Sequence, residues 1–233
     1  MAERSSIFDM IGPVMIGPSS SHTAAVVRIG INARKLLGEE PKEVEITFYN
    51  SFARTYEGHG SDRAILGGLL GFAPDDHRIK EARKHAEEAK LKVNFRAVSN
   101  ASHLHPNSIR VHLRGQTQLV QVLGISRGGG LISILEIDGF GCNFNGQSDT
   151  LVISAHDVSG SVAFLTSIIA HEDCNIATMT VSRSARNDMA RLVLELDSPL
   201  RPLTLEYLRS VKWVDKVSYL PRADESWLGN PSS

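Results

Sequence analysis

Residues 150–182 decide the fold of the C-terminal third, and they read TLVISAHDVSGSVAFLTSIIAHEDCNIATMTVS. The apolar, β-branched stretch Thr150–Ala155 predicts a strand. Apolar residues then recur at helical spacing through Ser161–His171, which predicts an amphipathic helix. Asn175–Ser182 (NIATMTVS) is again typical of a strand.

The same alternation of strands and helices continues toward the C-terminus. Arg183–Asp188 is a polar hairpin connection, and Ala190–Leu196 (ARLVLEL) predicts the next strand. Pro199–Pro202 breaks the chain before a short helix at Leu203–Ser210, and Trp213–Tyr219 alternates as a last strand. The order β-α-β-β-α-β is that of a ferredoxin-like unit.

The first 147 residues predict a mixed α/β domain. We expect helices at Thr23–Leu37, Gly60–Leu70 and Asp75–Ala89, and strands at Val44–Tyr49, Val93–Ala97, Ser108–Leu113, Gln118–Ser126 and Leu131–Ile137. The polar segment Asn143–Ser148 contains Gly and predicts a linker. The expected fold class is therefore α+β, with domains at 1–147 and 148–221 and a loose tail at 222–233.

Charge and hydropathy exclude several classes of partner. The 233 residues include 25 Lys plus Arg and 26 Asp plus Glu, a net charge of −1, so nothing attracts nucleic acid or an anionic membrane. No apolar run approaches the roughly 20 residues of a membrane span. The polar start Met1–Ser6 lacks the pattern of a secretory signal. We therefore expect a cytoplasmic protein.

The chain has only two cysteines, Cys142 and Cys174. Two thiols cannot build a disulfide framework, a four-thiolate zinc site or a complete iron–sulfur site. We expect both to be reduced and structural, and we expect no metal site within the chain. An iron–sulfur cluster would need ligands from another chain.

The segment Gly17–Thr23 (GPSSSHT) precedes a predicted helix. The plain interpretation is that Ser21 caps the helix. Three serines, a histidine and a threonine exceed what a cap needs, however, and hydroxyls beside a helix N-terminus suit a carboxylate or a phosphate. His22 could then transfer a proton or orient the ligand.

Ser51–Thr55 (SFART) and Gly58–Asp62 (GHGSD) form a second candidate site. His59 stands between two glycines, where the backbone can approach a ligand closely. Glycine between a strand and a helix is also ordinary loop chemistry, so both interpretations stay open.

Two further segments carry weaker signals. His103 and His105 could ligate a metal, but no nearby third ligand completes a site, so a plain His105–Asn107 (HPN) turn is favoured. The glycine run in Ser126–Gly130 (SRGGG) could cradle an anion, although a flexible hairpin or a bulge is the better interpretation.

Together these motifs resemble the β chain of bacterial iron–sulfur L-serine dehydratases. The resemblance covers about residues 7–221 and is carried by Phe8–Pro13, Gly17–Thr23, Arg28–Gly30, Ser51–Ala53, Gly58–Asp62, Gly67–Gly71, His105–Asn107 and Ser126–Gly130. The C-terminal β-α-β-β-α-β unit resembles an ACT domain, a small-ligand module that often binds amino acids.

The chain departs from the family pattern at three places. Ser61 stands where the family usually has threonine, and Arg54–Glu57 lacks the small and basic residues expected before Gly58. The turn Asp157–Gly160 lacks the proline that ACT domains commonly place before this glycine.

The resemblance implies a chemistry and a partner. In this family a [4Fe–4S] cluster held by cysteines of an α chain acts as a Lewis acid on serine, which loses its α-proton and water. The aminoacrylate that forms becomes pyruvate and ammonia. The resemblance thus implies a lyase subunit that needs the α chain, in a hetero-oligomer that binds L-serine.

The resemblance also implies roles for particular residues. His22 and His59 are the expected catalytic residues, with His22 and the serine hydroxyls positioning the substrate carboxylate. The expected substrate-binding residues are Ser19, Ser20, Ser21, Thr23, Ser61 and Asn107. The expected contacts to a regulatory ligand in the ACT domain are Asp157, Gly160 and Asn175.

Two other function classes stay open. The chain could be a purely regulatory amino-acid-binding subunit, since the first domain of this family resembles an allosteric substrate-binding domain of some 3-phosphoglycerate dehydrogenases. Loss of regulation without loss of turnover in His22 and His59 variants would favour that role. An ACT-containing transcription regulator is disfavoured by the net charge and by the lack of a basic helix-turn-helix pattern.

Overall fold

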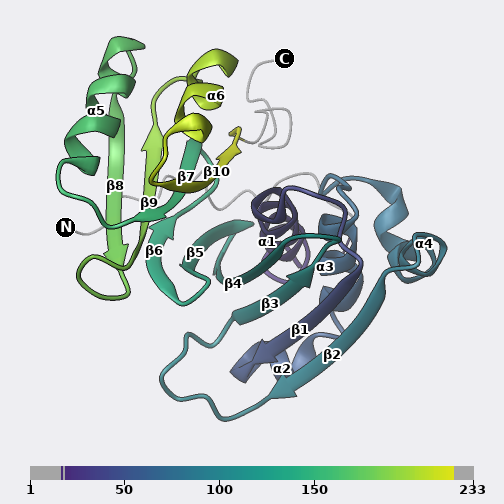
Figure 1. Ribbon diagram of the computed structural model, residues 1–233. Helices are drawn as coiled ribbons and strands as arrows, with labels where there is room; N and C mark the ends of the chain where they lie inside the picture. Colours follow the sequence, from purple (N-terminus) through teal and green to yellow (C-terminus); the bar gives the residue numbers. More distant parts are fainter. Residues whose placement is uncertain (1–16, 18, 223–233) are drawn as a thin grey trace. The chain divides into compact units, whose positions relative to one another are not determined.

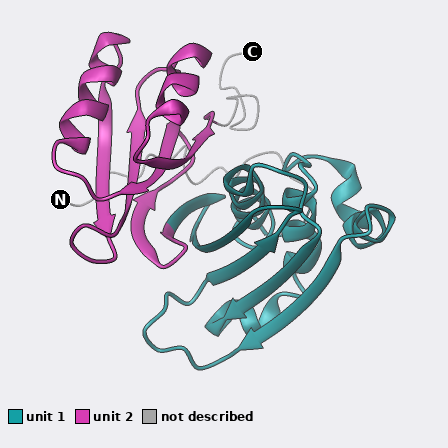
Figure 2. Cartoon of the chain, in the orientation of Figure 1, with its two compact units in different colours: residues 1–134, 224–233 teal, residues 135–223 magenta. Residues whose placement is uncertain are grey.

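The computed structural model describes residue 17 and residues 19–222, and these divide into two compact units (Figures 1 and 2). The first unit runs up to Ile134 and the second starts at Leu135. The expected linker at 143–148 lies later in the chain, around the end of a short strand, and the expected boundary stays a prediction. The Phe8–Pro13 motif and nearly all of the expected C-terminal tail lie outside the described residues.

The elements of the first unit mostly match the expected ones. They are α1 (Ala24–Leu37), β1 (Glu43–Tyr49), α2 (Asn50–Thr55), α3 (Ser61–Leu69), the 3₁₀ helix η2 (His77–Glu81), α4 (Ala82–Glu88), β2 (Lys92–Val98), β3 (Ser108–Arg114), β4 (Leu119–Gly128) and β5 (Leu131–Ile137), which crosses into the second unit. The expected single helix at 75–89 was wrong in part, because its first half is a 3₁₀ turn capped by the Asp76 carboxylate.

The sheet of the first unit runs in the order β2-β1-β3-β4-β5. β1 pairs with β2 in parallel and with β3 antiparallel, so the sheet is mixed. On β3, Ile109, Val111 and Leu113 are buried and alternate with more exposed residues. This period of two gives the sheet one apolar face, on which the helices pack.

Helices α1 and α3 cross at unusually short distance. A Cβ on Gly68 would lie 2.1 Å from the Val27 carbonyl oxygen, and one on Gly30 would lie 2.7 Å from the Ile65 carbonyl oxygen. Only glycine permits this approach of two helix backbones. Ser61, the first residue of α3, also donates to the carbonyl oxygen of His22 just before α1, so the N-terminal ends of both helices lie in one region of the unit.

Helix α1 also lies tightly on β4. A Cβ on Gly124 would be 2.9 Å from Ile29 Cγ2, so glycine is again required. Beyond β4 the chain turns back into β5 through Gly129 and Gly130, whose φ angles of 59° and 82° fit a type I′ turn. The hairpin interpretation of Ser126–Gly130 is thereby confirmed.

The second unit has the expected β-α-β-β-α-β order. After β6 (Phe140–Phe144), its elements are β7 (Asp149–His156), α5 (Ser161–His171), β8 (Ile176–Arg183), β9 (Met189–Leu196), α6 (Pro202–Ser210) and β10 (Val214–Leu220). The four-stranded antiparallel sheet has the order β10-β7-β9-β8, which is the ferredoxin-like topology (Figure 1).

The core of the second unit lies between this sheet and its two helices. Alternate residues of β7 and β9 pack against the apolar sides of α5 and α6, including Leu151, Ile153, Leu192, Leu194, Leu165, Ile169, Leu205 and Leu208. The buried residues recur at every second position in the strands and at helical spacing in α5 and α6, so both sets pack against each other in one core layer. Among the residues that the structure describes, no helix is both long and apolar enough to cross a membrane.

Candidate functional site

Five segments of the first unit, each of which carries one of the sequence motifs, are linked to one another by contacts. We call them the loop cluster: residues 19–23, 51–55, 58–62, 105–107 and 126–130. Backbone hydrogen bonds tie three of them together. Ser51 N donates to Pro106 O at 2.9 Å, and Ser126 N donates to Asn107 O at 3.0 Å. Segments up to 75 residues apart in the chain are therefore neighbours in space.

The Ser19–Thr23 loop forms a turn that leads into α1. Backbone oxygens of the loop accept hydrogen bonds from N–H groups at the start of the helix: Thr23 N donates to Ser19 O and Ala25 N donates to Ser20 O. The helix starts at Ala24, with Thr23 at the N-cap position and no side-chain cap. The expected capping role of Ser21 was therefore wrong. The hydroxyls of Ser20 and Ser21 form no hydrogen bond with any described residue.

His22 is held at both ring nitrogens. Ser19 Oγ lies 3.2 Å from Nδ1, and Thr55 Oγ1 lies 3.2 Å from Nε2. Because the Thr55 hydroxyl donates its one proton to Ser51 O at 3.0 Å, it accepts from Nε2–H of His22. In the neutral ring Nδ1 then accepts from Ser19. These contacts fix the tautomer and the orientation of the ring.

The surroundings of His22 favour its neutral form. Burial, and secondarily the nearby His59, hold the pKa of His22 below its ordinary value. The two imidazole rings have centroids 4.6 Å apart. His22 is thus a neutral, fixed ring at neutral pH.

His59 has one ring nitrogen anchored and one available. The Thr55 carbonyl oxygen lies 3.2 Å from Nδ1 and 3.0 Å from the backbone N of His59. A carbonyl oxygen only accepts, so Nδ1 carries the proton and Nε2 keeps its lone pair. No described residue forms a hydrogen bond with this Nε2. His59 is therefore the histidine of the pair that can exchange a proton with a ligand.

Ser61 has a structural role. It is fully buried, and its hydroxyl donates to the His22 carbonyl oxygen at 2.9 Å. The preceding Gly60 adopts a left-handed φ of 72°, which lets the chain turn into α3. The expectation that Ser61 binds substrate does not fit this geometry, because its proton is used within the chain and its side chain is covered.

A cavity of about 260 Å³ opens beside His59. Its lining includes Thr23, His59, Arg63 and Lys80. Thr23 is 2% exposed, and its Oγ1 has no hydrogen-bond partner among the described residues. A hydroxyl, an imidazole and two cationic side chains around one small space suit a small anionic ligand.

Sequence reasoning gave no role to three of these residues. Thr55 stood in the second candidate segment, Ser51–Thr55, but only the structure shows that it contacts both histidines. Arg63 of α3 and Lys80 of η2 line the cavity beside His59. No local pattern marks Thr55, because its hydroxyl contacts the backbone oxygen of Ser51 and a histidine 33 residues away.

The His105–Asn107 segment forms the expected turn. Asn107 N donates to His105 Nδ1 at 3.1 Å, and the Asn107 side chain forms no hydrogen bond with a described residue. His103 is exposed, and no group of three or more His, Cys, Asp or Glu residues in the described part of the chain could hold a metal ion. The Asn107 amide lies in the loop cluster with its hydrogen-bonding capacity available.

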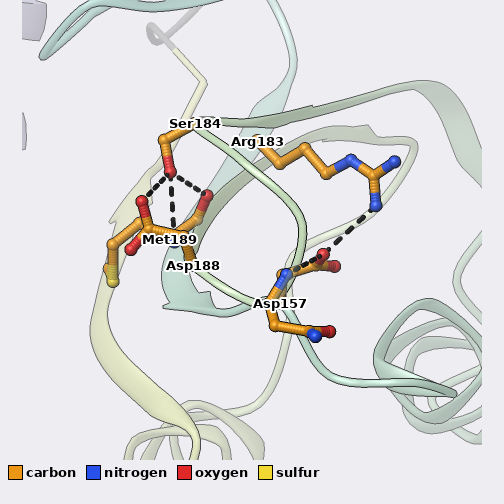
Figure 3. Close-up of polar contacts among 6 residues, drawn as sticks. Asp157, Arg183, Ser184, Asp188 and Met189 are labelled. Carbon is orange, nitrogen blue, oxygen red and sulfur yellow. Dashed lines mark hydrogen bonds and ion pairs between the residues drawn. The ribbon is translucent and has the colours of Figure 1, made fainter.

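The expected regulatory residues do not gather in one place. Figure 3 shows Asp157 at the end of β7, where its carboxylate accepts from Asn187 N at 3.1 Å and from Arg183 Nη1 at 3.2 Å. Gly160, with a φ of 84°, stands at the N-cap of α5. Asn175 precedes β8 at the opposite end of the sheet, because Ile176 pairs with Leu196 and Leu196 with Asp149. A single ligand site made of all three residues within one chain does not fit the sheet register.

The two thiols do not fit an iron–sulfur cluster. Both are buried, burial raises the pKa of Cys142 to about 12, and the Cys174 thiol donates to Ser198 O at 3.3 Å. A cluster ligand must be a thiolate. Two buried thiols, one with a raised pKa and one that donates a hydrogen bond within the chain, match the expected structural role.

Comparisons with known proteins support the sequence resemblance. The family described as "Serine dehydratase beta chain" matches residues 6–136. A protein of Bacillus subtilis named "Probable L-serine dehydratase, beta chain" is 39% identical over 213 residues, covering 91% of this chain and 96% of its own length. The "L-serine dehydratase, beta chain" of Peptoniphilus asaccharolyticus is 34% identical over 198 residues, covering 84% and 88%.

One solved structure is similar to a part of the chain. It is the ACT domain from GTP pyrophosphokinase of Chlorobium tepidum, 23% identical, covering 31% of this chain and 95% of its own, with a TM-score of 0.27.

Proposed function

The chain belongs to the serine dehydratase β-chain family, and from this premise we propose that it is one of the two chains of an L-serine dehydratase. The complete enzyme would convert L-serine to pyruvate and ammonia. This chain would supply the loop cluster as part of the active site and the ferredoxin-like unit as a regulatory module. The observation that carries the proposal is His59, with an available Nε2, beside a small cationic cavity.

His59 is the proton-transferring group in this proposal. Dehydration of serine removes the α-proton and the β-hydroxyl, so a base must reach Cα or a proton must reach the leaving oxygen. Nε2 of His59 can do either, because Nδ1–H is anchored on Thr55 O, Nε2 keeps its lone pair and His59 lines the cavity. His22 would act as a positioning residue, since both of its ring nitrogens are occupied.

The cavity supplies binding groups for an amino acid. Arg63 and Lys80 would attract the substrate carboxylate, and the unpartnered Thr23 hydroxyl would form a hydrogen bond with it. The Ser20 and Ser21 hydroxyls and the Asn107 amide stay as proposed substrate contacts. A volume of about 260 Å³ accommodates a molecule of serine's size.

The proposal requires a partner chain. The serine dehydratases that this chain resembles use a [4Fe–4S] cluster. The described residues of this chain offer no set of ligands for one. The cluster would therefore be held by cysteines of an α chain that docks on this one.

The test is a purification and an assay on the same sample. The tagged chain is isolated anaerobically from its native host, and pyruvate release from L-serine, cluster absorbance and a co-purifying cysteine-bearing chain are recorded. We expect all three, and we expect activity to vanish when the partner is removed. Saturable serine binding with no partner, no cluster and no pyruvate would contradict the proposal and favour the regulatory role.

The regulatory role remains the second candidate because the second unit has the ferredoxin-like topology that ACT domains share. His22→Ala and His59→Ala separate the two functions in the intact complex. Loss of turnover in either variant supports an active-site role, whereas unchanged turnover with altered serine dependence supports regulation alone.

A further inference from the structure

Arg28 is a buried cation, and two of its three guanidinium nitrogens have no hydrogen-bond partner among the described residues. It lies on α1 and is 8% exposed. Nη1 donates to Gly130 O at 2.7 Å, in the turn between β4 and β5. Nε and Nη2 are covered and have no partner among the described residues. A buried guanidinium without its hydrogen bonds is costly, so this arrangement calls for a ligand.

The unused atoms form one edge of the guanidinium. Nε–H and Nη2–H point in parallel from the same side of the planar group, and this edge matches the two oxygens of a carboxylate. No carboxylate of the described residues offsets the charge. Burial alone lowers the pKa of Arg28 from its very high ordinary value, and the group stays cationic at neutral pH.

A second unpartnered group lies on the same side of the sheet. Ser126 is fully buried, and its Oγ has no partner among the described residues. It is two residues after Gly124, so its side chain leaves β4 on the face that contacts Ile29 of α1. Arg28 precedes Ile29 and reaches the turn that follows Ser126. Both groups therefore face the layer between α1 and the end of β4.

We propose that the Nε–Nη2 edge of Arg28, together with the Ser126 hydroxyl, binds the carboxylate of a small molecule. The bidentate edge fixes the carboxylate plane, and the hydroxyl donates to one of its oxygens. Gly130 borders the proposed site, because its carbonyl oxygen accepts from Nη1 of Arg28. Arg28 does not line the cavity at His59, so this site is additional to the proposed substrate site and does not rest on it.

The site is tested by titrating the full-length chain with sodium acetate, L-serine and inorganic phosphate at constant ionic strength. Binding is followed by calorimetry and by the NMR signal of the Arg28 Nε–H. L-Serinamide, which lacks the carboxylate, is the control ligand. We expect saturable binding of acetate or L-serine that shifts the Arg28 signal, and no binding of L-serinamide.

Variants identify the groups responsible. Arg28→Lys keeps the charge but loses the parallel donors and is expected to weaken carboxylate binding about tenfold or more. Ser126→Ala leaves Arg28 in place and is expected to weaken it by a smaller factor. Arg34→Lys is the matched control, since Arg34 lies on the same helix but pairs with Glu40.

Three results would overturn the proposal. They are the absence of carboxylate binding in the folded wild-type chain, binding of phosphate alone, and carboxylate binding that neither Arg28→Lys nor Ser126→Ala changes.

Discussion

Helices α3 and α5, one in each unit, begin in the same way but serve their units differently. Each follows a left-handed glycine, Gly60 or Gly160, and each has serine as its first residue. Ser61 is fully buried and donates to the His22 carbonyl oxygen. Ser161 is half-buried, and its side chain forms no hydrogen bond with a described residue. The same helix start thus takes part in the hydrogen bonds of the candidate site in the first unit, whereas it forms only a turn in the second.

The contrast extends to the buried polar groups of each unit. In the first unit Thr23, Arg28, Asp62 and Ser126 have buried atoms without partners among the described residues. In the second unit the Asp157 carboxylate is bound by the β8–β9 hairpin, and Ser184 and Asp188 bond to each other (Figure 3). Arg191 Nε is an exception, but that guanidinium pairs with Asp138. Unused polar capacity therefore points to the first unit as the place where ligands bind.

Gly68→Ala should have the largest effect, because it disrupts the close packing of α3 against α1 in the first unit. Its Cβ would lie 2.1 Å from the Val27 carbonyl oxygen. We expect a loss of about 3 kcal/mol or more in the free energy of unfolding of the first unit, measured by urea denaturation. Gly141→Ala, with no atom within 4 Å of its Cβ, is the control and should be tolerated. Equal stability of the two variants would contradict the account of the crossing.

Ser61→Ala and Ser161→Ala compare the two helix starts directly. The first leaves the His22 carbonyl without its buried donor and should cost about 1–3 kcal/mol of unfolding free energy. The second removes no side-chain hydrogen bond to a described residue and should have little effect. Unfolding curves of both variants measure the difference, and equal losses would show that the two starts are equivalent after all.

The pH dependence of stability should differ between the units. The folded state holds the pKa of His22 below its ordinary value of about 6.5, so the unfolded state binds more protons just below that pH. The His22 contribution to stability is therefore complete above pH 6.5 and declines as the pH falls below it. The difference between wild type and His22→Asn, measured from pH 8 to pH 5, should show this slope. A flat difference, or one that grows in acid, would contradict the neutral, buried ring.

Asp157 should give the smallest effect, in a different pH range. Hydrogen bonds from Asn187 N and then Arg183 hold the pKa of this carboxyl below its ordinary value of about 3.9. Its contribution is present above that pH and is lost as the pH falls through the lowered pKa. Thermal unfolding of Asp157→Asn should therefore converge with wild type in strong acid. A difference that persists there would assign the stabilisation to another cause.

Periodic segments were predictable from sequence because the buried positions of a strand or a helix recur at a fixed spacing and are occupied by apolar residues. The bounds of α5 and β5 were predicted to the residue, and the β-α-β-β-α-β order was confirmed. Two short elements were missed. α2 has six residues, too few for a helical period, and β6 contains Gly and Asn. The Asp138–Gly139 pair, with φ angles of 51° and 82°, was a hairpin signal that would have revealed β6.

The two histidines of the candidate site were predictable from the sequence, but the role of each was not. His22 and His59 were found from sequence, and the structure brings their rings together. Which of them keeps an available nitrogen depends on Thr55, whose hydroxyl and carbonyl contact one ring each. Arg28 stood within a quoted motif, yet only burial and the missing partners of its guanidinium reveal a further site. Such properties are set by neighbours distant in sequence, and no local pattern records them.

The most direct test of the central claim is the kcat for pyruvate formation from L-serine in complexes containing His59→Asn or Asp157→Asn. His59→Asn should lower kcat by about 10²–10⁴-fold with the complex and its cluster intact, because proton transfer by Nε2 is lost. Asp157→Asn should leave kcat within about twofold of wild type, as expected for a group outside the reacting centre. If His59→Asn keeps wild-type kcat in an intact complex, the loop cluster of the first unit is not part of the active site.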